Sequence, residues 1–491
     1  MQIRDQLFIN GEWVDAADGA RFDVTDPADS SVLAQCAAAK GSDVTKAVAA
    51  AKTCFESGAW DGNNIMGRSA IMHKAAALIN DNMQWLAELE SRDVGKPLAE
   101  SAGFDVPSGG ATIEYFADLA VDITGTTFPM AYDQVLDYTV REPLGVVGSI
   151  IPWNFPFLIA CRKIGSALAA GNAVVVKPAS WAPLSTLALG DIFKAAGLPD
   201  GALNILTGAG SIAGEALAQH PDVHEISFTG STEVGRSIMS SCVGSLKGCE
   251  LELGGKSPAL VLPDCDMNET IEGTLFGAFL NQGECCCAAT RMLVHEAVYD
   301  EYVEKFLAAS AAIKIGMPLD EDTRMGAMVH PDQTAKVLEY VQSGLDEGAK
   351  LAMGGSRLTD APFGQGTFLP PTVFVDVDPN ITISREEIFG PVVVITKVKD
   401  MEEMLRMAND SCYGLTASVW TTNLKSGHML ARDLKAGTIW LNLHNFVFPM
   451  APYGGYKDSG IGRELGREGL LAMTQTKNVM VSMFEGGFKW Y

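Results

Sequence analysis

Apolar and polar positions follow several different patterns along the 491-residue chain, and each pattern predicts a different kind of element. Near the N-terminus, short apolar segments interrupted by Gly, Pro and Asp predict a β-hairpin that turns at Asn10-Gly11. Ala-rich segments with helical spacing then predict long packed helices, for instance Val44 to Phe55 and Ser69 to Asn82. A period of two returns at Gln134 to Arg141, which predicts a strand either in a projecting arm or in an ordinary edge hairpin.

From residue 145 onward, continuous apolar segments alternate with helical ones. This pattern is typical of parallel sheets that are covered by helices on both faces. The first round predicts strands at 146–151, 173–176 and 203–206 and helices at 160–170 and 185–196. The second round predicts strands at 257–261, 291–294, 392–396 and 418–420 and helices at 300–313 and 333–347. Two such sheets indicate an α/β protein with two Rossmann-like domains and a cleft between them. The tail from residue 479 is strand-like again, and we expect it to rejoin the 124–141 hairpin.

Composition narrows the class of protein. With 47% apolar and 20% charged residues the chain is typical of a compact soluble protein, and a net charge of −24 argues against nucleic acid or an anionic membrane as a partner. The N-terminus has no secretory signal pattern and no apolar segment approaches the roughly 18 residues of a membrane span, so we expect a cytoplasmic protein. Ten cysteines and seven histidines lack disulfide or metal-ligand spacing, so we expect no metal centre.

Three consecutive cysteines, Cys285 to Cys287, lie in the glycine-containing segment Phe279 to Ala288. Because their spacing suits neither a disulfide nor zinc, a catalytic thiol is the alternative to consider. A thiol needs a base, a donor for the developing anion and an acceptor for electrons before it does chemistry. The rest of the chain is therefore searched for these partners.

Three further segments supply candidates. Asn154 lies between two prolines just after a predicted strand, where its amide could stabilise an oxyanion, although it could equally cap a turn. Glu252 lies between two leucines, which favours a raised pKa and a general base, while an exposed strand acid is the alternative. The segment Glu225 to Gly235 reads as strand, glycine turn and helix start, which suits a diphosphate but is also an ordinary strand-to-helix turn.

Taken together, seven short motifs resemble, in order, those of the aldehyde dehydrogenase superfamily, and they extend over nearly all of the chain. These motifs are Pro152 to Pro156, Lys177-Pro178, Phe228 to Ser231, Glu252 to Lys256, Phe279 to Cys286, Glu386 to Pro391 and Pro452 to Lys457. The resemblance implies a Rossmann-type cofactor domain at 1–123 and 144–254, a catalytic domain at 255–470, and a β oligomerisation arm at 124–143 and 471–491. It also implies a homodimer or homotetramer.

The same resemblance implies a reaction and the residues that perform it. A small-molecule aldehyde would be oxidised to a carboxylic acid with NAD or NADP and water, through a thiohemiacetal and a thioester on Cys286. Asn154 would stabilise the oxyanion, Glu252 would activate water, and Glu464 with Lys163 would pass protons outward. The implied cofactor contacts are Trp153, Lys177, Ser180, Gly230, Ser231, Gly235, Leu253, Glu387 and Phe389. The implied substrate pocket comprises Phe155, Arg162, Cys285, Cys287, His444 and Phe446.

Departures from the family pattern limit what can be inferred about specificity. Glu284 replaces a usual Gln beside the nucleophile; it would raise the thiol pKa if it pointed inward, but we expect it to point outward. Ser180 replaces the glutamate of relatives that strongly prefer NAD, so NADP is permitted. Arg162 occupies a position that is also Arg in succinic semialdehyde dehydrogenases, but those enzymes carry a second arginine where this chain has Leu280. The aromatic loop at 443–450 instead resembles that of enzymes for aryl or phenylacetaldehyde-type substrates.

Two alternatives to this function stay open at the level of sequence. A coenzyme-A-acylating relative would exclude water from the thioester, and Glu252 argues against it. A non-catalytic relative, kept as a binding or structural protein, is disfavoured because the residues at 154, 252 and 286 are intact.

Overall fold

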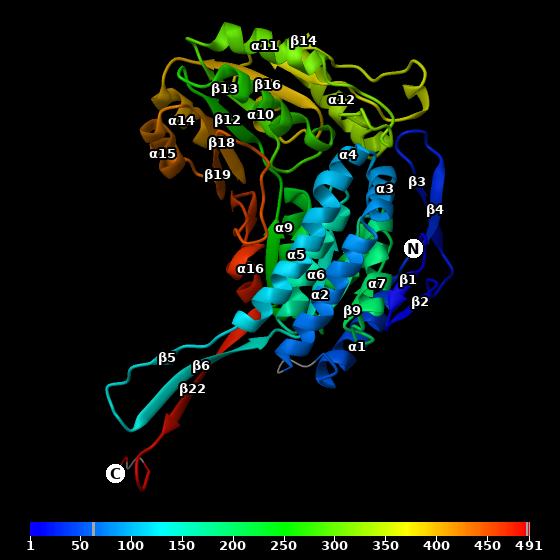
Figure 1. The fold of residues 1–491 in the computed structure, drawn as a ribbon, viewed down its shortest axis with the longest axis vertical. Helices are drawn as coiled ribbons and strands as arrows, with labels where there is room; N and C mark the ends of the chain where they lie inside the picture. Colours follow the sequence, from blue (N-terminus) through cyan, green and yellow to red (C-terminus); the bar gives the residue numbers. More distant parts are fainter. Residues whose placement is uncertain (61–63, 488–489, 491) are drawn as a thin grey trace.

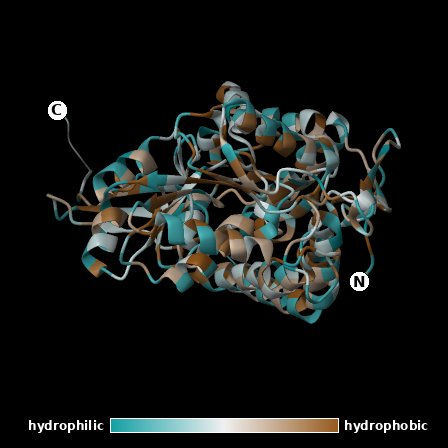
Figure 2. Cartoon of the chain, turned by 90° about the horizontal axis from the view of Figure 1, so that it is seen from above, coloured by the Kyte–Doolittle hydropathy of each residue, from teal (hydrophilic) through white to brown (hydrophobic). Residues whose placement is uncertain are grey.

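The computed structural model describes residues 1–60, 64–487 and 490. Its framework is an eight-stranded sheet and a seven-stranded sheet, and a three-stranded sheet projects away from both (Figure 1). Helices pack on the two large sheets, so the predicted α/β class is confirmed. In Figure 2 the strands at the centre of the molecule are mostly brown, whereas many helices show a hydrophilic outer face.

The eight-stranded sheet has the order β2-β1-β9-β8-β7-β10-β11-β21. Strands β9 to β11 along this order run parallel, and the N-terminal hairpin adds its two strands antiparallel at one edge. The hairpin turns at Asn10 and Gly11, which both have positive φ, as predicted. The strands are β1 (Leu7–Ile9), β2 (Glu12–Val14), β7 (Val146–Ile151), β8 (Ala173–Pro178), β9 (Leu203–Ile205), β10 (Glu225–Thr229), β11 (Gly248–Glu252) and β21 (Gly460–Ile461).

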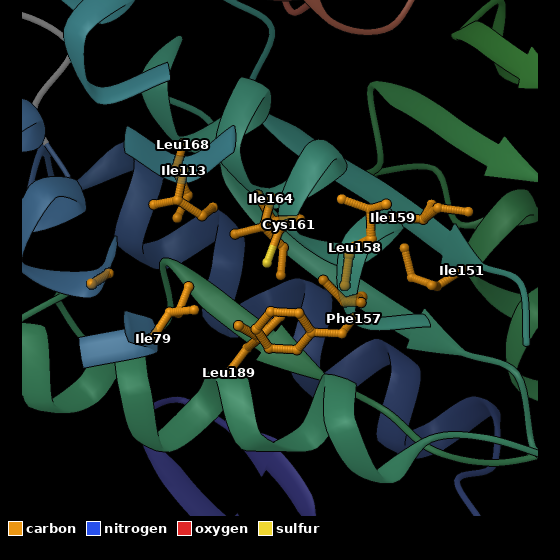
Figure 3. Packing of buried hydrophobic residues seen from close by; sticks show 14 of the residues in the cluster. Ile79, Ile113, Ile151, Phe157, Leu158, Ile159, Cys161, Ile164, Leu168 and Leu189 are labelled. Atoms are coloured by element: carbon orange, nitrogen blue, oxygen red, sulfur yellow. The ribbon is translucent and has the colours of Figure 1, made fainter. Parts of the chain in front are cut away.

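A layer of helices surrounds α6 (Pro156–Ala169), which is buried on nearly all sides because its residues are almost all apolar. Side chains of α6 meet Ile79, Ile113 and Leu189 from three other helices and Ile151 from β7 (Figure 3). The site residues carried by α6 therefore sit on a rigid support. The other helices of this half are α1 (Gly41–Glu56), α2 (Ile65–Asp81), α3 (Met83–Val94), α4 (Leu98–Glu100), α5 (Val106–Leu119), α7 (Leu184–Ala196), α8 (Glu215–Gln219) and α9 (Thr232–Cys242).

The seven-stranded sheet has the order β14-β15-β16-β13-β12-β18-β19 and is parallel except for β14 at its edge. All four strands predicted for this half are present. The strands are β12 (Ser257–Val261), β13 (Ala289–His295), β14 (Lys350–Met353), β15 (Thr372–Val375), β16 (Val392–Val398), β18 (Thr416–Trp420) and β19 (Thr438–Leu441). The helices are α10 (Met267–Phe279), α11 (Tyr299–Ala311), α12 (Pro331–Asp346), α13 (Thr382–Arg385), α14 (Met401–Asn409) and α15 (Leu424–Asp433).

The projecting sheet joins segments that lie far apart in the sequence. Strand β6 (Val135–Pro143) pairs antiparallel with β22 (Thr474–Ser482) along its whole length and with the short β5 (Thr127–Phe128). The chain therefore does return to the 124–141 hairpin as predicted, although the strand begins at Thr474, before the predicted start. Residues 488, 489 and 491 of the predicted tail lie outside the described residues.

Two further antiparallel strand pairs are formed by β3 (Arg21–Thr25) with β4 (Val32–Ala37) and by β17 (Tyr413–Gly414) with β20 (Tyr456–Lys457). Helix α16 (Gly466–Ala472) precedes β22. Strand β21 joins the eight-stranded sheet although it comes late in the chain. The domain boundaries stay a prediction. Within the described residues, every helix is too short or too polar to cross a membrane.

Candidate active site

The loop that carries the three cysteines begins with an unusual backbone. After α10 the chain forms a tight turn at Leu280–Gly283, in which Asn281, Gln282 and Gly283 all have positive φ, at 50°, 56° and 74°. Such residues are costly unless their surroundings hold them. At Gly283 a Cβ atom would lie 2.4 Å from the carbonyl oxygen of Gly390, so only glycine fits without a shift of the backbone.

Hydrogen bonds hold this turn from several directions. The Asn281 amide donates to Glu100 Oε2 at 2.9 Å. The Gln282 side chain donates to the carbonyl of Ala327 at 3.1 Å and accepts from the amide of Gly326 at 3.1 Å. Because both side chains of the turn are buried and bonded, the loop that follows is fixed in position before any substrate arrives.

The three thiols differ in exposure and in partners. Cys285 and Cys287 are buried, with their sulfur atoms 3.4 Å apart, whereas Cys286 is partly exposed. The Cys287 thiol donates to Asn445 Oδ1 at 3.3 Å, an acceptor that favours retention of its proton. The sulfur of Cys286 lies 3.9 Å from the hydroxyl of Tyr453. Cys286 is therefore the sulfur most accessible to a substrate.

The contacts among the thiols also set their acidity. Contact with Cys285 lowers the pKa of Cys286, but contact with Cys287 and burial outweigh it and raise the pKa to about 12. The same contacts lower the pKa of Cys287. The hydrogen bond from Cys287 to Asn445 opposes this effect, because it holds a thiol rather than a thiolate. In this state the Cys286 thiol is protonated at neutral pH, so a base must act before it attacks.

Asn154 lies directly beside this loop. It follows β7, is 3% exposed, and donates from Nδ2 to the carbonyl of Glu284 at 2.9 Å. Its own carbonyl accepts from Asn281 Nδ2 at 2.9 Å. These partners lie far away in the sequence, so Asn154 joins the end of β7 to the cysteine loop, and the alternative that it only caps a local turn is wrong.

Glu284 does not point outward, and the expectation that it does is corrected. Its side chain is fully buried, and its carboxyl oxygens accept from the Val329 amide at 3.2 and 3.3 Å. Burial raises its pKa well above the usual range, which favours the uncharged form of the group. In that form an inward Glu284 adds no negative charge next to Cys286. The loop then continues into β13, and the Glu284 side chain lies on the inner side of the turn.

Glu252 ends β11 and faces the interior, which excludes the alternative of an exposed strand acid. The side chain is 4% exposed, and neither carboxyl oxygen has a hydrogen-bond partner among the described residues. Burial, together with the charges of Glu464 and Glu250, raises its pKa well above the usual range. Such a group suits a general base that takes up a proton and can change its orientation.

The two glycines after Glu252 allow close contacts that join the two halves of the site. A Cβ at Gly255 would lie 2.4 Å from the carbonyl oxygen of Cys286, and a Cβ at Gly254 would lie 2.2 Å from Glu387 Oε2. The Gly255 amide donates to Glu387 Oε1 at 2.9 Å. The end of β11 therefore packs directly on the backbone of the cysteine loop.

Lys163 and Glu464 form a buried ion pair, with Lys163 Nζ 2.5 Å from Glu464 Oε1. Lys163 also donates to Ser227 Oγ at 2.7 Å, and that hydroxyl donates to Glu250 Oε2 at 2.9 Å. The ammonium comes from α6 and the serine from β10, so helix and sheet meet at this pair. The predicted proximity of Lys163 and Glu464 is present, and Glu250 is an unpredicted member of the group.

The residues expected to contact the cofactor gather around the carboxyl ends of the eight-stranded sheet. Lys177 on β8 is 4% exposed, burial lowers its pKa to about 8, and its ammonium has no hydrogen-bond partner among the described residues. Ser180 donates from Oγ to the Gly208 carbonyl at 2.7 Å. Ser231 caps α9 by accepting from the Val234 amide, which places the positive end of that helix at the turn after β10.

The remaining members lie at the turn after β10 and around Phe389 and Glu387. The Gly230 amide donates to the Glu252 carbonyl at 3.0 Å, and a Cβ at Gly235 would lie 2.5 Å from Leu253. The ring of Trp153 meets that of Phe389 edge-on at 5.1 Å. Burial raises the pKa of Glu387 to about 7. An unpartnered lysine, a helix N-terminus and glycines without Cβ atoms suit a group that carries phosphates and hydroxyls.

A mainly apolar cavity of about 420 Å³ leads to Cys286. Its lining comprises Phe104, Phe155, Leu158, Ile159, Arg162, Leu280, Cys285, Cys286, Cys287, Asn445, Val447 and Tyr453. Arg162 is its one charged residue, and its buried Nε has no hydrogen-bond partner among the described residues. The guanidinium lies 5.9 Å from the centre of the Tyr453 ring. A guanidinium whose Nε has no partner among the described residues suits an anionic group on a ligand, and Asp105 is the acid whose charge already interacts with Arg162.

His444 and Phe446 do not line this cavity, contrary to the prediction for the substrate pocket. His444 is 1% exposed, its Nε2 lies 2.8 Å from the Cys287 carbonyl, and burial lowers its pKa to about 4. Phe446 is 50% exposed and its ring lies 6.1 Å from that of Phe276. The intervening residues Asn445 and Val447 line the cavity instead, because the loop presents alternate side chains to it.

Comparison with known proteins agrees with this geometry. The model of the aldehyde dehydrogenase family matches residues 13–479. The chain belongs to the aldehyde dehydrogenase family. Mitochondrial aldehyde dehydrogenase of Rattus norvegicus is 44% identical over 481 residues, which cover 98% of this chain and 92% of the relative. Mitochondrial benzaldehyde dehydrogenase of Antirrhinum majus is 43% identical over 480 residues, 98% of this chain and 89% of the relative.

Solved structures of other aldehyde dehydrogenases have the same fold. The NAD⁺ complex of aldehyde dehydrogenase from Bacillus cereus superposes with a TM-score of 0.95 at 42% identity, over 98% of this chain and 96% of the other. The predicted family and fold are therefore confirmed, and this aldehyde dehydrogenase is an oxidoreductase that acts on an aldehyde.

Several residues at or near the site of this aldehyde dehydrogenase were not predicted from the sequence. Glu250 precedes Glu252 by two positions in one strand, and that spacing indicates a shared face, so the signal was present. Tyr453 lies within a quoted motif but had no predicted role. Phe104 comes from the π-helix at Ser101–Asp105, and no local pattern connects it with residues more than 50 positions later.

Proposed function

We propose that this aldehyde dehydrogenase oxidises its substrate to a carboxylic acid with NAD(P)⁺ and water through a thioester on Cys286. The observation that carries the proposal is the cavity lined by the partly exposed Cys286, together with two groups that act on the same loop: Asn154 donates to the carbonyl of Glu284, and the charge of Cys286 interacts with the unpartnered carboxyl group of Glu252. These are the nucleophile, the anion-stabilising donor and the base that thiol chemistry requires.

In the first half-reaction the Cys286 thiol loses its proton to a base, and the sulfur bonds to the aldehyde carbon. Negative charge then develops on the former carbonyl oxygen. Asn154 Nδ2 already lies at the loop and is positioned to donate to this oxygen. NAD(P)⁺, which Lys177, Glu387 and the N-terminus of α9 would hold, would supply the acceptor for the hydride that the same carbon loses, and a thioester would remain on the sulfur.

In the second half-reaction Glu252 takes a proton from water, and the resulting hydroxide attacks the thioester carbonyl. The carbon–sulfur bond breaks, the carboxylic acid leaves, and Cys286 is regenerated as a thiolate. The raised pKa of Glu252 favours this proton uptake. We propose that the proton then leaves by way of Lys163 and Glu464, whose charges interact with Glu252. A thioester taken by coenzyme A in place of water is the alternative, and a product assay with and without the thiol cofactor decides between them.

The cofactor preference rests on Ser180. Its hydroxyl donates to Gly208 and carries no charge that would repel a 2′-phosphate. We propose that both NAD and NADP bind, with Lys177, Glu387 and the N-terminus of α9 as the main contacts. Initial rates with each cofactor measure the preference, and exclusion of NADP would contradict it.

The substrate proposed for the cavity has an apolar body and a distal carboxylate. Aromatic and aliphatic side chains line most of the cavity, and Arg162 supplies its one positive charge, with a buried Nε that has no hydrogen-bond partner among the described residues. These observations combine the two sequence predictions, an aryl substrate and a semialdehyde. For Arg162→Leu we expect KM for a carboxylate-bearing aryl aldehyde to rise about 10- to 100-fold, with little change for its neutral analogue. Equal effects on both substrates would exclude the carboxylate contact.

We also propose that the β5–β6–β22 sheet joins two or four copies of the chain. Its edge strands offer unpaired backbone groups, and Phe128, Met480 and Val481 are exposed on it. Light scattering on the full chain and on a variant with charged residues at Met480 and Val481 tests this assembly. A monomeric wild-type protein would contradict it.

The test of the nucleophile compares the three cysteines one at a time. We expect Cys286→Ala to abolish aldehyde-dependent NAD(P)H formation, while Cys285→Ala and Cys287→Ala keep at least about a tenth of the wild-type rate, since they only line the cavity. Normal turnover of the Cys286 variant would refute the mechanism.

A further inference from the structure

Glu250 belongs to a buried group of hydrogen-bonded side chains whose charges act on the proposed general base, Glu252. In the parallel pairing of β10 with β11, Glu250 lies opposite Ser227, and this register explains their hydrogen bond of 2.9 Å. Ser227 in turn accepts from Lys163, and Lys163 donates to Glu464. Ser227 has one proton to donate and gives it to Glu250. The two hydrogen bonds therefore run in one direction, from the Lys163 ammonium to the Glu250 carboxylate.

The charges in this group do not balance. Three buried carboxyl groups, at 250, 252 and 464, share a single ammonium, so full ionisation would leave two uncompensated negative charges. Burial disfavours that state, and at least one carboxyl group holds a proton near neutral pH. Burial and then the charge of Glu464 raise the pKa of Glu250 to about 8. The ionisable groups that interact with Glu250 or Glu252 from neighbouring elements are Glu225, Lys163, Glu464, Cys286 and Tyr453.

The backbone around Glu250 makes room for this side chain. Gly462, in the segment that leads to Glu464, has a φ of 93°, and a Cβ there would lie 3.1 Å from Glu250 Cγ. One oxygen of Glu250 has no hydrogen-bond partner among the described residues. A side chain that only filled space would need neither the serine bridge nor a carboxyl group at this position.

We propose that Glu250 is a positioning residue for the second half-reaction: through Ser227 it orients Lys163, and its charge tunes the protonation of Glu252. This inference rests on the proposed function. Glu250 touches neither substrate nor cofactor, and it acts on the breakdown of the thioester while leaving its formation unchanged. Its negative charge favours the protonated form of Glu252, and the Lys163 ammonium opposes this effect.

The test is Glu250→Gln, which keeps the size of the side chain and an oxygen that accepts from Ser227. Acyl-enzyme is formed by mixing full-length enzyme with aldehyde and NAD⁺, and its breakdown is followed by acid quench and mass spectrometry across pH. Glu250 is charged only above its pKa of about 8, and there the loss of its negative charge lowers the pKa of Glu252, so the base form persists to lower pH. We expect the acid limb of the breakdown rate to move down by roughly half to one pH unit, with an unchanged burst of NADH.

Two further variants complete the experiment. Glu225→Gln removes a half-buried acid on the neighbouring strand that has no bond to Lys163 among the described residues, and we expect a clearly smaller shift than for Glu250→Gln. Ser227→Ala cuts the bridge without changing the charge. We expect it to slow breakdown about three- to tenfold, which keeps the inference testable if Glu250→Gln does not fold.

A breakdown profile of Glu250→Gln that superimposes on the wild-type profile would overturn the inference, as would unchanged breakdown in Ser227→Ala. If the proposed function itself is wrong, the wild-type enzyme will form no acyl-enzyme, and this result distinguishes the two failures.

Discussion

The loop that carries Cys286 and the strand end that carries Glu252 are both buried, yet they are held in opposite ways. The loop has three consecutive residues with positive φ, and it is tied by Glu100, Gln282 and Asn154 to three other parts of the chain. The carboxyl group of Glu252 has no hydrogen-bond partner among the described residues. One group is fixed in place and the other is restrained only by packing.

This difference matches the two half-reactions proposed. Attack on an aldehyde needs a sulfur atom and an oxyanion donor in a set geometry, and strain held by the surroundings supplies it. Activation of water comes later, after the hydride has left, so the base must tolerate different neighbours before and after that step. A carboxyl group without fixed partners can do so, and the charges behind it set its proton affinity.

The largest effect on activity is expected from a substitution in the strained turn that precedes the three cysteines. In Gly283→Ala the new Cβ would lie 2.4 Å from the Gly390 carbonyl at a φ of 74°, which displaces the cysteine loop. We expect the NADH burst to fall about 100-fold and the free energy of unfolding to fall by about 1–3 kcal/mol, measured by stopped flow and by urea denaturation.

Gly19→Ala is the matched control for this strain. Gly19 has a φ of 69° but nothing within 4 Å of its Cβ position, so the substitution strains the backbone without displacing the loop. We expect a loss of about 1–2 kcal/mol in unfolding free energy and a normal burst. A normal burst in Gly283→Ala as well would mean that the strained turn does not position Cys286.

A large effect is also expected at the oxyanion donor. Asn154→Ala removes the Nδ2 donor beside Cys286, and we expect the burst rate to fall about 10²- to 10³-fold, because the developing charge loses a fixed hydrogen bond. Asn172→Ala removes another buried asparagine, which bonds to the Ala167 and Met473 carbonyls away from the cavity. If both variants slow the burst equally, Asn154 acts through folding alone.

The smallest effect on activity is expected at Glu284, the buried acid on the fixed side. Its folded-state pKa is raised by burial, so it contributes stability that is complete below its unfolded pKa of about 4.3 and is lost as pH rises through the folded pKa. Glutamine has no proton to lose. We expect Glu284→Gln to change turnover less than about threefold, and its Tm relative to wild type to increase between pH 6 and pH 9. A pH-independent difference in Tm would mean that Glu284 is ionised in the folded protein.

Sequence patterns predicted the elements well where one local rule decides them. Apolar strands such as 146–151 and 257–261 are present with those bounds, since their burial on both faces leaves a continuous apolar signature. The motif residues Asn154, Glu252 and Cys286 do converge at one cavity or beside it. This convergence followed from the order of motifs rather than from any local period.

The errors concern the directions of side chains. Glu284 points inward because the strained turn before it rotates the chain, and no neighbouring residue signals that turn. His444 and Phe446 belong to an irregular loop whose residues alternate in direction. The side chains of these two residues therefore do not line the cavity. Glu250 was overlooked although its spacing from Glu252 places both on one face, and only the pairing with Ser227 reveals its connection to Lys163.

The division between a fixed nucleophile and an adjustable base is tested most directly by trapping the thioester in Glu252→Gln. After mixing with aldehyde and NAD⁺, the quenched protein is digested and the peptide containing the three cysteines is analysed by mass spectrometry. We predict a normal NADH burst, followed by persistent acylation of Cys286 and slow release of acid. Acylation of Cys285 or Cys287, or rapid turnover with no trapped acyl group, would contradict the account.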